Sequence, residues 1–252
     1  VYTQWLHDFA NDDALVAELS ALTDEKQIED RFYTELAFGT AGMRGVLGYG
    51  TNRMNVYTVA KASQGLANYV VRRFSPEARR IAVSYDSRIK SDLFARVAAG
   101  VFAANGISVF IYPHLMPTPC LSYAVRALGC AAGVMVTASH NPAKYNGYKA
   151  YGPDGCQMTD DAAAVVYAEI QKTDVLAGAK LVSFEEGLAS GMIQYVEDAC
   201  KEALYDAIKA RSVRPGLCKT AGLKLVYSPL NGSGLVPVTR VLHDFGITDI
   251  TI

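Results

Sequence analysis

Short apolar segments alternate with longer amphipathic ones over most of the chain, and this pattern predicts both strands and helices. Continuous apolar runs at 80–85, 107–112 and 131–136 are typical of buried strands. Four longer segments carry apolar residues at helical spacing: 55–74, 93–105, 121–128 and 160–172. Because strands and helices alternate, we predict an α/β fold, a three-layer α/β/α domain with a mainly parallel or mixed sheet.

Residues 1–35 are predicted to form helices that pack beside this domain. Asn11-Asp12-Asp13 can cap one helix, and Thr23-Asp24-Glu25 can begin a second one. We interpret Trp5 and Phe9 as packing residues of this helical arm.

The pattern starts again in the last quarter of the chain. A helix is predicted at about 196–210, and a strand at 222–227 is followed by a helix and a strand at 248–252. We therefore expect an amino-terminal domain at 1–193 and the start of a second similar domain at 194–252. A single β-α-β unit would leave a sheet edge exposed, so we expect the chain to be the amino-terminal piece of a longer protein.

Composition narrows the possible partners. The 252 residues have a formal net charge of −1, which gives no indication of nucleic-acid or anionic-membrane binding. No apolar run approaches the length of a membrane span. The five cysteines have no C-x-x-C spacing, which favours free thiols in a reducing compartment over zinc or disulfides. We expect a cytoplasmic protein, and its oligomeric state is unknown from the sequence.

One stretch, Thr137-Ala138-Ser139-His140-Asn141-Pro142, carries most of the chemistry. It follows the apolar run at 131–136, so Ser139 is placed at the carboxyl end of a strand, where α/β sheets bind ligands. Asn146-Gly147 predicts a tight turn that returns the chain toward the loop with Lys149. The stretch would thus supply a hydroxyl, an imidazole, an amide and an ammonium group.

Two other segments offer guanidinium groups. The segment 38–45, Phe-Gly-Thr-Ala-Gly-Met-Arg-Gly, surrounds Arg44 with three glycines and Thr40. Exposed N–H groups and an arginine suit an anion, although a solvated arginine in a glycine-rich turn is the alternative. Asp86-Ser87-Arg88 follows the strand at 80–85. Arg88 would either bind an anion or form an exposed ion pair with Asp86 that contributes little stability.

Together these motifs resemble the α-D-phosphohexomutases, the phosphoglucomutase and phosphomannomutase family. The T-A-S-H-N-P box, followed by N-G-Y-K at 146–149, resembles the family's active-site serine loop. The boxes at 38–45 and 85–88 resemble F-G-T-A-G-x-R-G and Y-D-x-R. The resemblance covers essentially the whole chain and implies its place as the amino-terminal portion. It implies interconversion of hexose 1-phosphate and hexose 6-phosphate through a phosphoserine and a bisphosphorylated sugar.

The resemblance also implies roles for the reacting groups. Ser139 would carry the phosphate, which would in turn hold part of a Mg²⁺ shell. Lys149 would accept the substrate hydroxyl proton, or serve only as a fixed positive charge. Neighbouring side chains on an extended chain point apart. We therefore expect His140 to contact phosphate or substrate rather than to deprotonate Ser139.

The remaining candidates would bind rather than react. Thr40, Arg44 and Arg88 are expected to contact phosphate, and Asn141 to orient the loop through its amide. The resemblance implies a small phosphosugar as the partner, with Mg²⁺ and glucose 1,6-bisphosphate as cofactor and activator.

The sequence departs from the family in lacking an aspartate-rich metal loop of D-G-D-G-D-R type. We expect these residues alone to have little mutase activity. Two other functions are considered. A serine hydrolase would use a G-x-S-x-G elbow, which Ala138 and His140 do not match. A non-catalytic sugar-phosphate-binding relative would be marked by a broken serine box, and the box here is intact.

Overall fold

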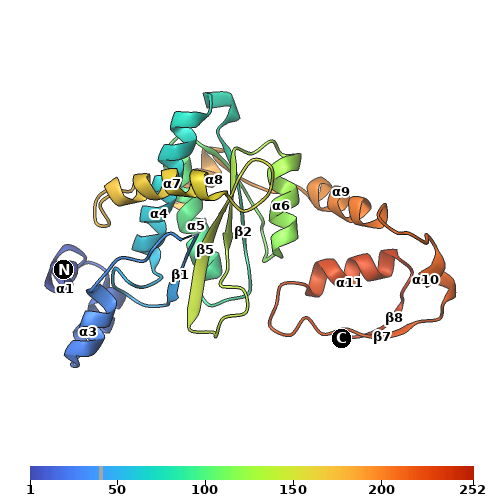
Figure 1. Cartoon of the computed structure of the whole chain (residues 1–252), viewed down its shortest axis with the longest axis horizontal. Coiled ribbons are helices and arrows are strands. Elements are labelled where there is room, and N and C mark those ends of the chain that lie inside the picture. Colours follow the sequence, from blue (N-terminus) through green and yellow to red (C-terminus); the bar gives the residue numbers. More distant parts are fainter. Residues whose placement is uncertain (40–41) are drawn as a thin grey trace.

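The computed structural model describes residues 1–39 and 42–252, and its centre is a six-stranded mixed sheet in the order β1-β5-β4-β2-β3-β6 (Figure 1). The strands are β1 (Gly42–Val46), β2 (Arg80–Tyr85), β3 (Ser108–Ile111), β4 (Ala132–Val136), β5 (Tyr145–Tyr151) and β6 (Ile193–Tyr195). The neighbours from β4 to β6 are parallel, whereas β5 is antiparallel to both β4 and β1. The expected α/β class and mixed sheet are confirmed.

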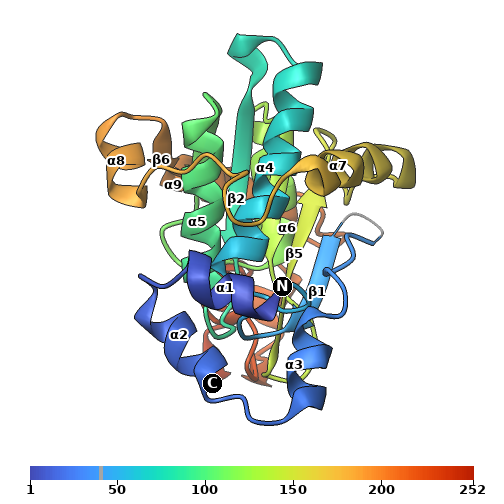
Figure 2. The ribbon, with the colours of Figure 1, turned by 90° about the vertical axis from the view of Figure 1, so that its left-hand side faces the viewer.

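Helices cover both faces of this sheet and make the domain three layers thick (Figure 2). One face packs against α4 (Val56–Arg73) and α5 (Ser91–Ala104), with α7 (Asp160–Lys172) lying on α4. The other face packs against α6 (Thr118–Ala127). Ile81 and Val83 point into the first layer and Ala82 into the second, as the alternation of a strand requires.

Local sequence explains where the longest helix begins. The side chain of Asn55 accepts hydrogen bonds from the N–H groups of Tyr57 and Thr58, and the Thr58 hydroxyl accepts one from the Asn55 N–H. This reciprocal capping satisfies donors that the first helical turn leaves free. The start predicted at residue 55 is therefore confirmed.

Three short helices form the predicted amino-terminal arm: α1 (Tyr2–Asp8), α2 (Asp13–Ser20) and α3 (Glu25–Phe32). Trp5 is 1% exposed and makes edge contacts with Phe9, Phe32 and Tyr57, the last of these from α4. The Tyr57 hydroxyl donates to the Asp12 carboxylate at 2.7 Å. The packing role predicted for Trp5 and Phe9 is confirmed, and the arm is attached to the sheet domain through α4.

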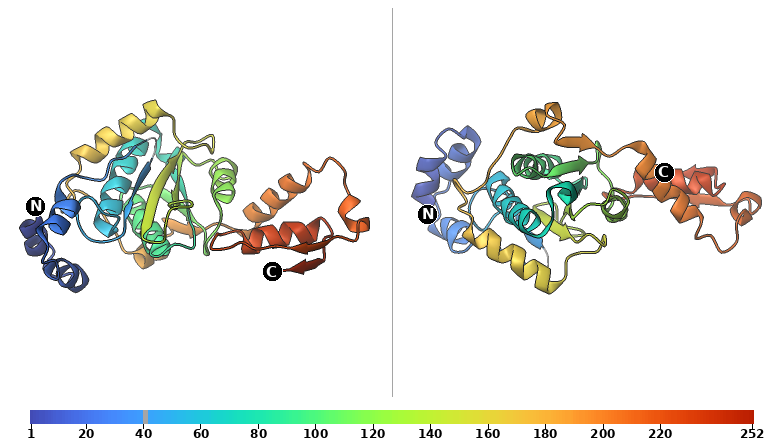
Figure 3. Two further views of the ribbon diagram at one scale, coloured as in Figure 1. Left: turned by 60° about the horizontal axis from the view of Figure 1, so that its bottom comes forward. Right: turned by 90° about the horizontal axis from the view of Figure 1, so that it is seen from above.

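The last part of the chain forms a small β-α-β unit beside the domain (Figure 3). The elements after α7 are α8 (Phe184–Ala189), β6, α9 (Asp198–Lys209), α10 (Leu217–Thr220), β7 (Lys224–Val226), α11 (Leu235–Asp244) and β8 (Asp249–Thr251). Strands β7 and β8 pair in parallel, and α9 contacts both α6 and α11. The expected domain boundary at 193 and 194 stays a prediction; β6 crosses that point and pairs with β3.

The predicted tight turn at Asn146-Gly147 is wrong, because both residues lie inside β5. A Cβ on Gly147 would stand 2.6 Å from the Thr137 carbonyl oxygen and 2.9 Å from that of Met43. The glycine is therefore needed for close approach of β5 to β1 and to the residue that follows β4, not for a turn. The actual reversal lies earlier, between Ala138 and Lys144.

Within the two described ranges, no helix combines the length and apolarity needed to cross a membrane. A short 3-10 turn, η1 (Pro76–Ala78), completes the regular structure between α4 and β2.

Candidate active site

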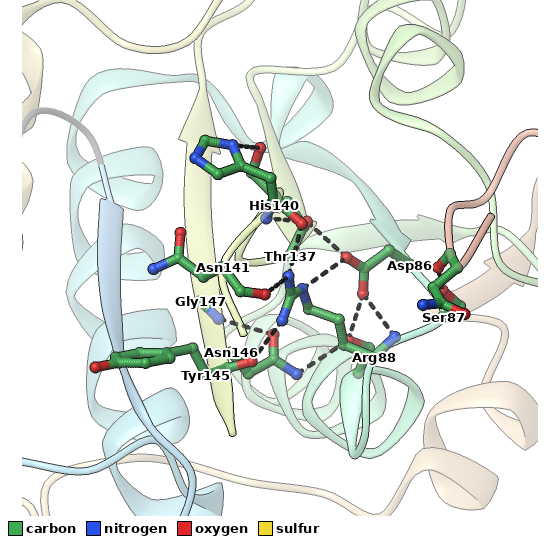
Figure 4. A network of polar contacts seen from close by, with 12 residues as sticks. Asp86, Ser87, Arg88, Thr137, His140, Asn141, Tyr145, Asn146 and Gly147 are labelled. Atoms are coloured by element: carbon green, nitrogen blue, oxygen red, sulfur yellow. Dashed lines mark hydrogen bonds and ion pairs between the residues drawn. The ribbon is translucent and has the colours of Figure 1, made fainter. Parts of the chain in front are cut away.

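The candidate site lies where two neighbouring parallel strands end. Tyr85 of β2 is opposite Val136 of β4, and the N–H of Asp86 donates to the Val136 carbonyl at 3.1 Å. We define the serine loop as residues 137–145. It therefore leaves the sheet beside the segment that follows β2 (Figure 4). This is the carboxyl edge of the sheet, as the sequence predicted.

Asp86 connects these two segments. Its carboxylate accepts from the Thr137 hydroxyl at 2.6 Å, from the Ser91 hydroxyl at 2.8 Å and from the Arg88 N–H at 3.0 Å. Ser91 in turn accepts a hydrogen bond from the amide of Asn146, and both residues are fully buried. Sequence reasoning missed Asp86 and Thr137 as parts of the site. Their places, directly after β2 and two residues before Ser139, were the available signal.

Ser139 has a left-handed backbone, with a φ of 55°, which is uncommon for a residue with a side chain. Its N–H donates to the Thr137 hydroxyl at 2.9 Å, and the N–H of Asn141 donates to the Ala138 carbonyl at 3.1 Å. These bonds fold the loop sharply around the serine. Ser139 is exposed, so its hydroxyl faces solvent rather than the core.

His140 lies beside the serine hydroxyl, with its Nδ1 atom 3.4 Å from the Ser139 Oγ atom. The expectation that the two side chains point apart assumed an extended chain, and it is wrong because Ser139 is left-handed. A serine hydrolase would need a third group to orient the imidazole. In the described parts of the chain His140 has Ser139 as its one hydrogen-bond contact, so that group is not supplied.

Arg44 reaches the serine loop from the edge strand β1. Its Nη1 atom donates to the amide oxygen of Asn141 at 2.8 Å. Pairing of β1 with β5 places Arg44 opposite Gly147, whose missing side chain leaves room at this edge. Arg44 is exposed, so part of its guanidinium faces solvent near Ser139. The structure thus brings Arg44 and Asn141 to the serine, as expected.

Arg88 is also at the site, but its side chain is turned inward. Its Nη atoms donate to main-chain carbonyls of the serine loop, and its Nε atom lies 3.6 Å from the Asp86 carboxylate. The side chains of Arg88 and Asp86 are 13% and 12% exposed. The alternative of an exposed surface pair is therefore wrong, and the expected phosphate contact stays a prediction.

Of the predicted residues that the structure describes, Lys149 is not part of these contacts. Lys149 lies further along β5, opposite Met135 of β4 and Gly42 of β1. The register of β1 and β5 puts Lys149 on the same sheet face as Arg44. Across the described ranges the side chain of Lys149 makes no hydrogen bond or ion pair, although its main chain pairs within the sheet. Thr40 falls outside the described residues.

A cleft of about 870 Å³ opens in front of the serine loop. Ser139, His140 and Asn141 line one side, and the turn at 229–232 lines the other. The Ser87 hydroxyl donates to the Asn231 carbonyl at 2.5 Å and joins the two sides of the cleft. A small phosphorylated ligand would fit this volume, which lies in the range of small-molecule pockets.

The described residues do not form a Mg²⁺ site by themselves. They contain no group of three or more His, Cys, Asp and Glu side chains placed to hold a metal ion. Of the described residues that line the cleft, Asp86 alone carries a carboxylate, and its oxygens are engaged by Thr137, Ser91 and Arg88. Since Mg²⁺ requires several oxygen ligands, the described residues supply at most part of its coordination shell.

Comparison with known proteins finds a family model and relatives whose sequences match the part of the chain that forms this site. Residues 35–176 match the family model described as phosphoglucomutase/phosphomannomutase, alpha/beta/alpha domain I. A "Probable phosphoribomutase" from Schizosaccharomyces pombe is 36% identical over 238 residues, covering 92% of this chain and 39% of the relative. A phosphoglucomutase from Staphylococcus haemolyticus is 35% identical over 242 residues, covering 96% and 43%. The chain thus spans about two fifths of the length of these relatives.

A solved structure gives the same picture for the fold. The crystal structure of a "putative phosphomannomutase" from Thermus thermophilus superposes with a TM-score of 0.72 at 27% identity. The match covers 86% of this chain and 45% of that one. The sheet, its helical layers and the serine loop therefore lie in a region shared with proteins that carry mutase names.

Proposed function

Because the chain belongs to the phosphoglucomutase/phosphomannomutase family, we propose that the full-length protein relocates phosphate on a hexose between positions 1 and 6. The observation that carries this proposal is the exposed Ser139 hydroxyl at the carboxyl end of β4, facing the cleft. A hydroxyl held there can receive and return a phosphoryl group. A phosphosugar is the ligand that the guanidinium of Arg44, beside the serine loop, and the size of the cleft suit.

The proposed reaction has two matched phosphoryl transfers. In the first, a sugar hydroxyl oxygen attacks the phosphorus on Ser139, the P–Oγ bond breaks and the hydroxyl gives up its proton. The product is a bisphosphorylated sugar and a free serine. After the sugar turns over in the cleft, the Ser139 Oγ atom attacks the phosphorus of its other phosphate, and the bond from that phosphorus to the sugar oxygen breaks. The serine then loses its proton, and the released sugar oxygen gains one.

His140 and Lys149 are the proposed proton carriers. The Nδ1 atom of His140 lies 3.4 Å from the Ser139 Oγ atom, near enough to hold the proton that the serine oxygen gains and loses. Such contacts are often long before substrate binds. Lys149, which shares a sheet face with Arg44, is proposed to accept the sugar hydroxyl proton or to serve as a fixed positive charge.

Arg44 is proposed to neutralise charge on the transferring phosphate, because its exposed guanidinium contacts Asn141 two residues from Ser139. The roles of Thr40, Mg²⁺ and the activator glucose 1,6-bisphosphate are carried over from the family resemblance. Mg²⁺ would neutralise phosphate charge when bound. A cytoplasmic location and low activity of residues 1–252 alone also stay predictions.

Conversion of glucose 1-phosphate to glucose 6-phosphate by the full-length protein tests the proposal. The assay contains Mg²⁺ and glucose 1,6-bisphosphate. Ser139→Ala should lower kcat at least about 1,000-fold, because the phosphate carrier is lost. Ser20→Ala, at the exposed end of α2, is the matched control and should leave kcat unchanged. Tight bisphosphate binding without turnover by the unsubstituted protein would favour a non-catalytic binding role.

A further inference from the structure

The guanidinium of Arg88 is enclosed by the backbone of the serine loop. Its Nη2 atom donates to the carbonyls of Ser139, at 2.6 Å, and of Asn141. Its Nη1 atom donates to the carbonyls of Pro142, at 3.1 Å, and of Tyr145, at 3.0 Å. Figure 4 shows the guanidinium at the centre of the loop, between Asp86 and Tyr145. One side chain thus gathers four carbonyls from a seven-residue segment.

A count of donors shows what this leaves for a ligand. A guanidinium has five N–H groups, four of them on the two Nη atoms. The four loop carbonyls use the Nη hydrogens, and the remaining Nε hydrogen faces the Asp86 carboxylate at 3.6 Å. With 13% of the side chain exposed, the Nη donors of Arg88 are engaged within the domain rather than offered to a phosphate in the cleft.

Asp86 fixes this arrangement to the buried frame of the domain. Its carboxylate accepts hydrogen bonds from the Arg88 N–H and from the Thr137 hydroxyl, and it forms an ion pair with the Arg88 guanidinium. Thr137 accepts the N–H of Ser139. Ser139 is therefore held from both of its peptide groups, through its N–H by Thr137 and through its carbonyl by Arg88. These two contacts support a left-handed conformation that a serine seldom adopts by itself.

We propose that Arg88 is a positioning residue, which holds the serine loop so that the Ser139 hydroxyl faces the cleft, and that it does not bind phosphate. This inference rests on the proposed function for the meaning of that position. The two arginines of the site, Arg44 and Arg88, then have different roles. Arg44 donates to a side chain of the loop and leaves part of its guanidinium exposed to solvent. Arg88 donates to main-chain carbonyls instead.

A lysine substitution separates the two roles. A lysine keeps the positive charge but has its three donors on one atom. It can therefore replace much of a phosphate contact, yet it cannot reach four carbonyls between Ser139 and Tyr145. A positioning role predicts that Arg88→Lys behaves like Arg88→Gln. A phosphate-binding role predicts that Arg88→Lys retains most of the function.

Hydrogen exchange of the full-length protein, followed by mass spectrometry, tests whether Arg88 holds the loop. In both Arg88→Lys and Arg88→Gln, peptides covering residues 138–145 should exchange about tenfold faster or more. Amides of β4 should keep their protection, which shows that the variants are folded. Arg44→Gln, which removes a side-chain contact only, should change loop exchange less than about threefold. Unchanged loop exchange in both Arg88 variants would overturn the proposal, whether or not Ser139 is phosphorylated.

Kinetics of the same variants supply the second readout. A misplaced serine should lower kcat about 100-fold in Arg88→Lys, with KM within a few-fold of the unsubstituted value. A raised KM with kcat preserved would assign Arg88 to phosphate binding and reject the positioning role. If the unsubstituted protein shows no phosphoryl transfer, the proposed function fails, and the exchange result alone decides the role of Arg88 in the loop.

One measurement needs no variant. In the unsubstituted protein, NMR of the Arg88 guanidinium should show separate, slowly rotating Nη groups, because four carbonyls hold them. Addition of glucose 1,6-bisphosphate should not shift the NMR signals of the Arg88 guanidinium by more than it shifts those of the Arg44 guanidinium. A freely rotating guanidinium would contradict the proposal.

Discussion

At the scale of single residues, Ser139 combines a reactive group with an unusual backbone. Its hydroxyl is exposed, and its φ of 55° is one that most side chains avoid. The N–H and carbonyl contacts with Thr137 and Arg88 offset the strain. This position also gives His140 its contact with the serine oxygen, so backbone conformation and chemistry are linked here.

The strain itself can be measured by two substitutions that both remove the hydroxyl. Ser139→Gly should be more stable than Ser139→Ala by about 1 kcal/mol, because glycine adopts the left-handed region without a Cβ penalty. Urea denaturation of the two variants gives the difference in free energy of unfolding. Equal values for the two variants would show that the backbone is not strained at this residue.

Buried thiols provide a residue-scale test away from the site. Burial, with a contribution from nearby Cys200, raises the pKa of Cys120 to about 11, and burial raises the pKa of Cys130 to about 12. Because the folded state holds these protons more tightly, their contribution to stability is complete below pH 9 and is lost as pH rises through about 11 for Cys120 and about 12 for Cys130.

Labelling of the native protein with iodoacetamide at about pH 8.5 should therefore modify the exposed Cys156 and spare Cys120 and Cys130. Mass mapping of the labelled cysteines gives the result, and labelling in urea is the control that all five thiols can react. Rapid labelling of Cys120 in the native protein would contradict its burial.

At the scale of elements, close helix packing depends on one glycine. Gly65 lies in α4 where α7 crosses it, and a Cβ there would stand 2.3 Å from the Cγ1 atom of Ile170 and 2.8 Å from its main-chain nitrogen. In an exposed helix, replacing glycine by alanine raises stability by about 1 kcal/mol. Here the same change forces two helices apart.

Gly65→Ala should thus lower the free energy of unfolding by about 1–3 kcal/mol, the usual cost of overpacking. Chemical denaturation measures this change in free energy. The prediction is that Gly65→Ala destabilises the protein, whereas the same change in an exposed helix stabilises it. A stabilised Gly65→Ala variant would mean that α7 does not pack on α4 as described.

The elements also show which features a sequence can predict. The helix expected at 55–74 is observed as Val56–Arg73, because its apolar spacing and its Asn55 cap are both local signals. The turn expected at Asn146-Gly147 failed because that glycine serves a contact with Thr137 and Met43, which are remote in sequence. Local patterns predicted strands and helices well, and they could not predict contacts between strands.

The candidate site also combines features that the sequence predicts with contacts that it does not predict. Ser139, His140, Arg44 and Asn141 were predicted and are together, because the loop after β4 meets the edge strand β1 that carries Arg44. The inward role of Arg88 could not be predicted, because its partners are main-chain carbonyls that no residue type reveals. Asp86 was overlooked for a related reason, as its acceptors serve the loop rather than a ligand.

At the scale of the whole molecule, the cleft is shared between two parts of the chain. The serine loop comes from the six-stranded sheet, and the turn at 229–232 comes from the small β-α-β unit (Figure 1). Arg240 of α11 pairs with Glu202 of α9 at 2.8 Å, and α9 packs on α6. The opening in front of Ser139 therefore depends on how this unit sits against the sheet domain.

The central claim is that Ser139 carries phosphate, and one measurement tests it most directly. The full-length protein is incubated with glucose 1,6-bisphosphate and Mg²⁺, and its peptides are mapped by mass spectrometry. We predict one phosphate on the peptide that contains Ser139, and its loss to added hexose monophosphate. A protein that is folded and binds the bisphosphate but carries no phosphate on Ser139 would contradict the account.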